Sequence, residues 1–160
     1  MKKLALSALC LVAGMGIASA EVVAPGQVTM DEYGFVPEPL TDQPGDPENG
    51  RKIVGSKSMG NCVSCHAITD MAQDVPFHGE VGPLLDGLPD RYPEAMVRGI
   101  LVNSKNVFQG TVMPAYYKVD GFIRVGDGYT GKALEGEVEP LLSAQQIEDV
   151  VAYLMTLKDE

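Results

Sequence analysis

The sequence predicts an all-α fold of three to four short helices joined by long loops. Residues 143–160 carry apolar side chains at helical spacing behind a serine that can cap a helix. Two other segments have a proline where a helix would begin, at Pro47 and just before residue 94. Glycine and proline turn signals fill much of the remaining chain, and almost no stretch alternates as a strand does.

The first twenty residues have the pattern of a cleavable export signal. Lys2 and Lys3 precede an apolar stretch that runs to Ile17, and Ala18-Ser19-Ala20 is typical of a cleavage site. A membrane anchor is the alternative, but the apolar stretch is shorter than the roughly 18 residues that a span needs. We therefore expect residues 1–20 to be removed, which leaves a mature protein without a membrane span.

The charge of the mature chain argues against a nucleic-acid partner. Removing residues 1–20 takes away two lysines and no acid, so the formal charge changes from −10 to −12. Binding to phosphates needs clustered lysine and arginine. The length suits one domain, which we assign to residues 47–160. Residues 21–46 carry four prolines among acids and glycines and are expected to form an extended arm. Whether this arm is disordered or lies over a surface stays open.

The first helix is expected from residue 47 to near Ser58. Asp46 is a suitable N-cap, and Pro47 suits the first helical position because its missing N–H needs no partner there. Gly50 and Gly55 weaken the helix but would allow another helix to cross it closely. Residues 69–92 read as loop, and residues 118–139 as a long turn-rich loop in which residues 122–125 can form a short strand.

Two later helices complete the set. After Pro93 an apolar stripe predicts a helix, and its members are Met96, Val97, Ile100 and Leu101. Near the end of the chain, Ser143 and Gln146 form a capping box before a second stripe, made of Ile147, Val150, Val151, Leu154 and Leu157. Three helices and long loops leave too small a core for a stable domain, so another group should fill the interior.

The mature chain has two cysteines, Cys62 and Cys65, and His66 follows them directly. C-x-x-C-H is the attachment signature of c-type haem, in which both thiols add to the vinyl groups of the porphyrin and the histidine binds the iron. A disulfide would close too short a loop to stabilise much, a thioredoxin-like site should follow a strand, and a zinc site lacks a clear fourth ligand. We predict one covalent haem c per chain, which also supplies the missing interior.

The iron needs a sixth ligand or an open site. His78 lies only twelve residues beyond His66 in a turn-rich loop, where a solvent-facing histidine is the simpler interpretation. Met113 lies in a loop that Pro114 stiffens, with ample chain to pass around the haem. The other methionines suit core filling. We predict that His66 and Met113 are the axial ligands, a pair that raises the reduction potential.

The order C-x-x-C-H, Gly-Pro, helix, Met-Pro and a final Ala-Tyr-Leu helix resembles class I cytochromes c. The resemblance covers roughly residues 47 to 158 and implies that fold around the haem. It places a carbonyl of the Gly82-Pro83 turn, here assigned to Pro83, against the imidazole of His66, and it puts Gly50 and Tyr153 at a helix crossing.

Three other side chains have more than one interpretation each. Arg91, beside Tyr92, can neutralise a haem propionate or be an ordinary solvated loop residue. Tyr116 and Tyr117 can line the haem edge, contact a partner or pack in the core.

More closely, "GNCVSCHAI", "GEVGPLLDGL", "VMPAYY" and "SAQQIEDVVAYLMTLK" resemble the SoxX family, the monohaem subunits of the SoxAX complex of bacterial sulfur oxidation. The resemblance implies a periplasmic heterodimer with a SoxA-type cytochrome, acting as an L-cysteine S-thiosulfotransferase that links thiosulfate to a cysteine of the carrier SoxYZ. The sulfur chemistry belongs to the partner, so we expect no catalytic residue here. This chain would pass electrons to a downstream cytochrome.

Two alternatives remain at this point. A free soluble electron shuttle would carry the same haem, and a peroxidase-like enzyme would leave the sixth position open. The extended arm and the loop at residues 118–139 favour a fixed partner over a free shuttle.

Overall fold

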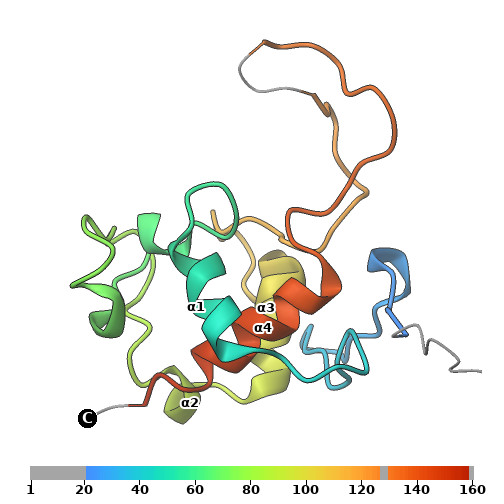
Figure 1. Ribbon diagram of the computed structural model, residues 1–160. Coiled ribbons are helices and arrows are strands. Elements are labelled where there is room, and N and C mark those ends of the chain that lie inside the picture. Colours follow the sequence, from blue (N-terminus) through green and yellow to red (C-terminus); the bar gives the residue numbers. More distant parts are fainter. Residues whose placement is uncertain (1–20, 127–129, 159–160) are drawn as a thin grey trace, which may run out of the picture.

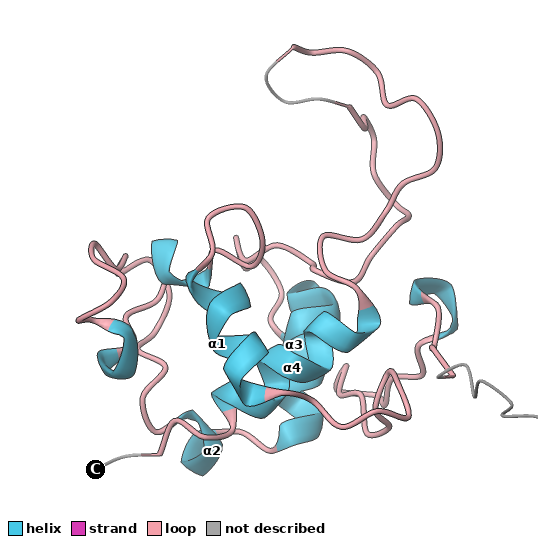
Figure 2. Cartoon of the chain, viewed as in Figure 1, coloured by secondary structure: helices cyan, strands magenta, loops and turns pink. Residues whose placement is uncertain are grey.

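The computed structural model describes residues 21–126 and 130–158, so the predicted export signal lies outside the described residues. The chain forms the helices α1 (Pro47–Gly55), α2 (Leu88–Arg91), α3 (Glu94–Val107) and α4 (Ala144–Leu154), with 3-10 turns at Pro25–Gln27, Cys62–Ser64 and Thr69–Met71. In the described ranges, pairing between extended segments is limited to two isolated bridges, as Figures 1 and 2 illustrate. The all-α prediction is confirmed.

Helices α1 and α4 cross closely at the centre of the body (Figure 1). A Cβ atom on Gly50 would lie 2.8 Å from the Cβ of Tyr153 and would overlap the carbonyl of Asp149. The side chain of Asp149 also accepts hydrogen bonds from the backbone N–H of Asp46 (2.8 Å) and from Asn49 Nδ2 (2.7 Å). The predicted crossing of Gly50 and Tyr153 is therefore present, and a carboxylate of α4 binds the start of α1.

The predicted caps are present at both helices. The Asp46 side chain accepts from the N–H groups of Glu48 and Asn49, and Ser143 forms its capping box with Gln146. Helix α1 ends at Gly55 rather than near Ser58, because Ser56 adopts an extended conformation (φ −80°, ψ 120°).

Two loop assignments need correction. Residues 69–92 contain α2, a single turn that begins after Gly87 in the left-handed conformation (φ 65°). So short a helix has no apolar period to reveal it. Residues 122–125 form no named strand; the chain pairs only at the isolated bridge between Gly126 and Ala133.

The segment at residues 21–46 lies against the body. Val36 and Leu40 are 2% and 1% exposed. The N–H of Val36 donates to the carbonyl of Ala95 on α3 (2.9 Å), and the N–H of Leu40 donates to Glu148 Oε1 on α4 (2.9 Å). Residues 21–46 therefore form an arm that packs on the domain rather than a disordered leader. The boundaries of this arm at residues 20 and 46 stay predictions.

A buried ion pair joins the arm to both long helices. Arg98 on α3 and Glu148 on α4 are 2% and 5% exposed. Arg98 Nε donates to Glu148 Oε1 (2.9 Å), and its Nη1 donates to the carbonyl of Val36 (3.1 Å). A buried pair is tolerated when its hydrogen bonds are satisfied, and losing one partner is costly. This pair therefore specifies where the arm sits.

The segment at residues 118–141 projects away from the body (Figure 1). Its apolar side chains are exposed: Phe122 50%, Ile123 106%, Leu134 43% and Leu141 62%. Among the helices that the structure describes, none is long and apolar enough to cross a membrane.

Candidate haem site

The cysteine motif forms one tight turn directly after α1. Asn61 takes the left-handed conformation (φ 50°) and opens the 3-10 turn Cys62–Ser64. The N–H of His66 then donates to the carbonyl of Cys62 (2.9 Å). Both motif cysteines are free thiols, with Cys62 buried and Cys65 half-buried. One turn of chain thus presents two thiols and an imidazole at the same place, as thioether attachment to a porphyrin edge requires.

The Gly82-Pro83 turn orients the imidazole of His66. His66 Nδ1 lies 2.7 Å from the carbonyl oxygen of Pro83, and because a carbonyl only accepts, Nδ1 carries the proton. In the neutral ring Nε2 is then unprotonated and has a lone pair for a metal. A Cβ atom on Gly82 would overlap the imidazole ring, so only glycine allows the turn to approach this closely.

Met113 borders the same cavity as the cysteine motif. The cavity has a volume of about 250 Å³ and is bordered by Cys62, Cys65, His66 and Met113. Most of its remaining wall is apolar and comes from the Gly-Pro turn, α2, α3, α4 and the Met113 loop: Val81, Pro83, Leu85, Leu88, Tyr92, Val97, Ile100, Leu101, Phe108, Val112, Pro114, Tyr116 and Leu154. An apolar cavity with two thiols, an imidazole and a thioether on its border fits a haem held at both axial positions.

Removal from water raises the pKa of Cys62 to about 11. Beside it, the hydroxyl of Tyr116 donates to the carbonyl of Gly60 (2.8 Å). Tyr116 is therefore a wall residue of the cavity, while Tyr117 donates from its hydroxyl to the carbonyl of Val23 on the arm (2.7 Å).

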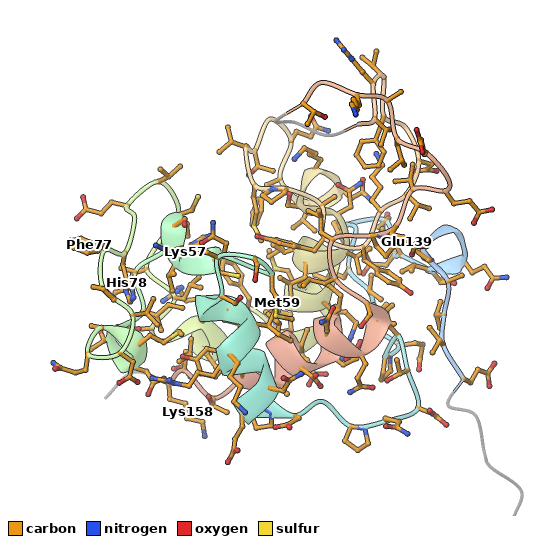
Figure 3. The ribbon with its side chains drawn as sticks, turned by 45° about the horizontal axis from the view of Figure 1, so that its top comes forward. Lys57, Met59, Phe77, His78, Glu139 and Lys158 are labelled. Atoms are coloured by element: carbon orange, nitrogen blue, oxygen red, sulfur yellow. The ribbon has the colours of Figure 1, made fainter. Side chains whose placement is uncertain are left out.

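His78 does not border this cavity. Its Nδ1 accepts a hydrogen bond from the N–H of Ile68 (3.2 Å). Its Nε2 is buried, and in the described part of the chain it has no hydrogen-bond partner. Figure 3 places His78 beside Phe77 on one loop, at the opposite side of the view from Glu139. The structure thus brings Met113, and not His78, to the cavity that His66 shares.

Arg91 is bound to the backbone of its own loop. Its two terminal nitrogens donate to the carbonyls of Asp86 (2.6 Å) and Leu84 (2.7 Å). Tyr92, its neighbour, borders the cavity, while Arg91 does not. The contact with a haem propionate stays a prediction, and a role in holding the loop that follows Pro83 is what the hydrogen bonds indicate.

Sequence analysis missed two residues that hold the Met113 loop. Ser104 on α3 is fully buried, and its hydroxyl donates to the carbonyl of Met113 (2.8 Å). Asn103, its neighbour, has non-helical dihedral angles inside α3 (φ −154°, ψ 94°). Asparagine and serine disfavour helix interiors, so a polar pair in the middle of a helical stripe was the available signal.

Comparison with known proteins identifies a family and a similar solved structure. The cytochrome c family model matches residues 47–158. A chain in the crystal structure of SoxXA from P. pantotrophus is 53% identical, with a TM-score of 0.80, and the alignment covers 85% of this chain and 98% of that chain. No curated protein sequence matches the chain significantly.

The chain belongs to the cytochrome c family, and its fold is that of the class I members. It therefore carries one covalently bound haem c. Within the family, the identity to SoxXA confirms the resemblance to SoxX that the order of the motifs indicated.

Proposed function

We propose that this chain is the electron-transfer subunit of a periplasmic SoxAX-type complex and relays electrons through a haem ligated by His66 and Met113. The observation that carries the proposal is the cavity, because an apolar pocket bordered by Cys62, Cys65, His66 and Met113 provides both attachment and two axial ligands. The haem supplies a reversible one-electron change at iron when bound.

Each residue of the chain then has a defined role. Cys62 and Cys65 tether the cofactor through thioether bonds. His66 offers Nε2 to the iron while Nδ1–H donates to Pro83, which fixes the ring and increases its basicity. Met113, which borders the same cavity, would offer its sulfur to the iron, and such a thioether ligand raises the reduction potential.

Relay is favoured over catalysis for two reasons. With His66 and Met113 both bound, the iron has no vacant position for a substrate. With Cys62 and Cys65 both tethered, the described chain has no free thiol left to carry sulfur. The thiosulfate chemistry, formation of a bond to a SoxYZ cysteine by L-cysteine S-thiosulfotransferase activity, would belong to a SoxA-type partner. A downstream cytochrome would accept the electrons.

The spectrum of the ferric protein tests the ligand pair. Met113→Ala should abolish the far-red absorption band of a methionine–iron(III) bond, produce a high-spin spectrum and lower the reduction potential. Met59→Ala is the matched control, since Met59 is partly exposed and does not border the cavity. A wild-type protein that is high-spin at rest would favour the peroxidase-like alternative and contradict the proposal.

Complex formation tests the partner. The loop at residues 118–141 exposes Phe122, Ile123 and Leu134, and burying them against a partner would remove apolar surface from water. Coexpression with the SoxA-type subunit of the same organism should yield a heterodimer in size-exclusion chromatography. If the chain elutes as a monomer that nevertheless exchanges electrons with other cytochromes, it is a free shuttle.

A further inference from the structure

We propose that Asn103 and Ser104 are positioning residues for the axial methionine, and that the break they make in α3 clamps the Met113 loop in the ligating position. The inference rests on the proposed function, because it takes Met113 to be the sixth ligand. It adds how the protein keeps that sulfur in place.

The extended conformation of Asn103 interrupts the hydrogen-bond pattern of α3. In a regular helix the N–H of Lys105 would donate to the carbonyl of Leu101. Here it donates to the side-chain oxygen of Asn103 (3.3 Å), whose backbone is extended (φ −154°, ψ 94°). The helix resumes at once, since the N–H of Phe108 donates to the carbonyl of Ser104 (2.8 Å). Asn103 therefore acts as an internal cap. The carbonyl of Leu101 can then accept a hydrogen bond from outside the helix.

The segment after Met113 binds the carbonyls before the break. The N–H of Tyr116 donates to the carbonyl of Leu101 (3.0 Å), and the N–H of Tyr117 donates to the carbonyl of Val102 (3.3 Å). Both tyrosines are buried. A continuous helix would use these carbonyls internally, so the two hydrogen bonds depend on the break.

Two donors beyond the break hold Met113 itself. The fully buried hydroxyl of Ser104 donates to the Met113 carbonyl at 2.8 Å, and Lys105 Nζ donates to the same oxygen. On the other side of the residue, the N–H of Met113 donates to Thr111 Oγ1 (3.2 Å). The backbone of Met113 is thus bound at both its carbonyl and its N–H, which restricts the range of its sulfur.

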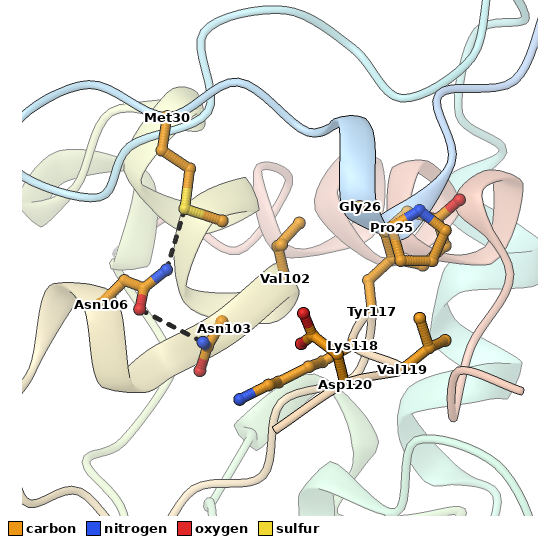
Figure 4. A pocket seen from close by; sticks show the side chains of 10 residues that line it. All are labelled: Pro25, Gly26, Met30, Val102, Asn103, Asn106, Tyr117, Lys118, Val119 and Asp120. Carbon is orange, nitrogen blue, oxygen red and sulfur yellow. Dashed lines mark hydrogen bonds between the residues drawn. The ribbon is translucent and has the colours of Figure 1, made fainter. Parts of the chain in front are cut away.

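The outer side of the break is supported by the arm. Asn103 Nδ2 donates to Asn106 Oδ1 (3.2 Å), and Asn106 Nδ2 donates to the sulfur of Met30 (2.9 Å), as the dashed lines in Figure 4 show. These groups border a small cavity of about 150 Å³ between the arm, α3 and residues 117–120. The side chain of Asn103 is therefore held in the orientation that caps Lys105.

Competition between imidazole and the Met113 sulfur for the sixth position of the iron measures how firmly the loop is held. Imidazole added to the ferric, haem-loaded protein binds only when the methionine leaves the iron, so its apparent affinity reports the fraction of detached sulfur. Ser104→Ala removes a buried hydrogen bond and should tighten imidazole binding by roughly five- to tenfold. Asn103→Ala should do the same and should speed amide hydrogen exchange at Tyr116 and Tyr117, whereas Asn103→Asp keeps the capping oxygen, loses the donor to Asn106 and should give an imidazole affinity between those of wild type and Asn103→Ala.

Val54→Ala is the matched control for lost stability. Val54 is fully buried in α1 and borders neither the break nor the cavity, so its truncation should lower the melting temperature without changing imidazole affinity. Wild-type imidazole affinity in both Ser104→Ala and Asn103→Ala would overturn the clamp, as would an equal gain in Val54→Ala. A wild-type protein without a methionine–iron band would instead overturn Met113 as ligand, which separates the two failures.

Discussion

Two consecutive segments after α3 behave in opposite ways. Residues 108–117 are bound to α3 through the hydrogen bonds of Met113, Tyr116 and Tyr117. Residues 118–141 leave the body and carry a fully exposed Ile123; among the hydrogen bonds within their described part, the N–H of Leu134 donates to the carbonyl of Val125 (3.2 Å). Both are turn-rich loops by sequence, yet only the first belongs to the core.

The difference follows from what each segment must do. Under the proposed function Met113 binds the iron, and a metal ligand has to be held close to its productive geometry, which the hydrogen bonds to α3 would do. A surface for a partner needs accessible apolar side chains, and long loops without secondary structure are usually functional. The first segment is bound by its own chain, whereas the second exposes its apolar side chains, as the proposed contact with a partner would require.

Emptying the cavity should have the largest effect, because it removes the group that fills the interior beside the first segment. Replacing Cys62 and Cys65 by serine should abolish covalent haem. The apolar walls of the cavity are then left to solvent, and the loss is expected to be a large part of the roughly 5–15 kcal/mol that holds a whole domain folded. Haem-stained denaturing gels and circular dichroism measure both results.

Ser64→Ala is the control for the cysteine substitutions, because Ser64 is exposed within the same motif. It should retain haem and lose less than about 1 kcal/mol. A colourless but cooperatively folded double serine variant would contradict the view that the haem completes the core.

A matched pair of isoleucines compares the body with the projecting loop. Ile147 on α4 is fully buried and Ile123 is fully exposed. Ile147→Ala should lower the free energy of unfolding by about 2–5 kcal/mol. Ile123→Ala should change it by less than about 0.5 kcal/mol. Denaturant titration of both variants measures the two free energies of unfolding. A large loss of stability in Ile123→Ala would mean that the loop packs on its own chain.

The helix crossing should show a smaller effect. Gly50→Ala brings a methyl group against Asp149 and Tyr153 and should destabilise by about 1–3 kcal/mol, despite the better helix propensity of alanine. Gly26→Ala, in the arm, meets no atom within 4 Å and should be close to neutral. Thermal unfolding of the two variants tests the close crossing of α1 and α4. Equal melting temperatures would show that the crossing accommodates a methyl group at residue 50 without loss of stability.

The smallest effect is expected at Asp70, which joins three parts of the body. Arg51 Nε (2.9 Å) and the hydroxyl of Tyr153 (2.8 Å) donate to its carboxylate, and the hydrogen bond from Arg51 lowers the pKa of Asp70. A lowered pKa stabilises the fold above the unfolded value of about 3.9, and the gain is lost as pH falls through the folded value.

Asp70→Asn should therefore cost less than about 1 kcal/mol at neutral pH, because the pair is half exposed. The difference from wild type should shrink as the pH is lowered from 5 toward about 2. Urea titrations across that range measure it, and a difference that grows on acidification would reverse the assigned sign.

The features that the sequence by itself determined are those that depend on neighbouring residues. The haem motif at Cys62–His66, the cap at Asp46 and the capping box of α4 depend on residues within a few positions of one another, and each was predicted. Helix α2 was not predicted, because a single helical turn is too short to show an apolar period.

Tertiary structure decided the rest, because those features depend on contacts between distant residues. The Pro-rich arm packs because Leu40 and Val36 meet Glu148 and α3. The break at Asn103, beside the loop of the predicted ligand Met113, arises where a loop takes over the hydrogen bonds of a helix. Such an exchange leaves no periodic pattern in the sequence, since its free energy is realised only once both segments are folded together.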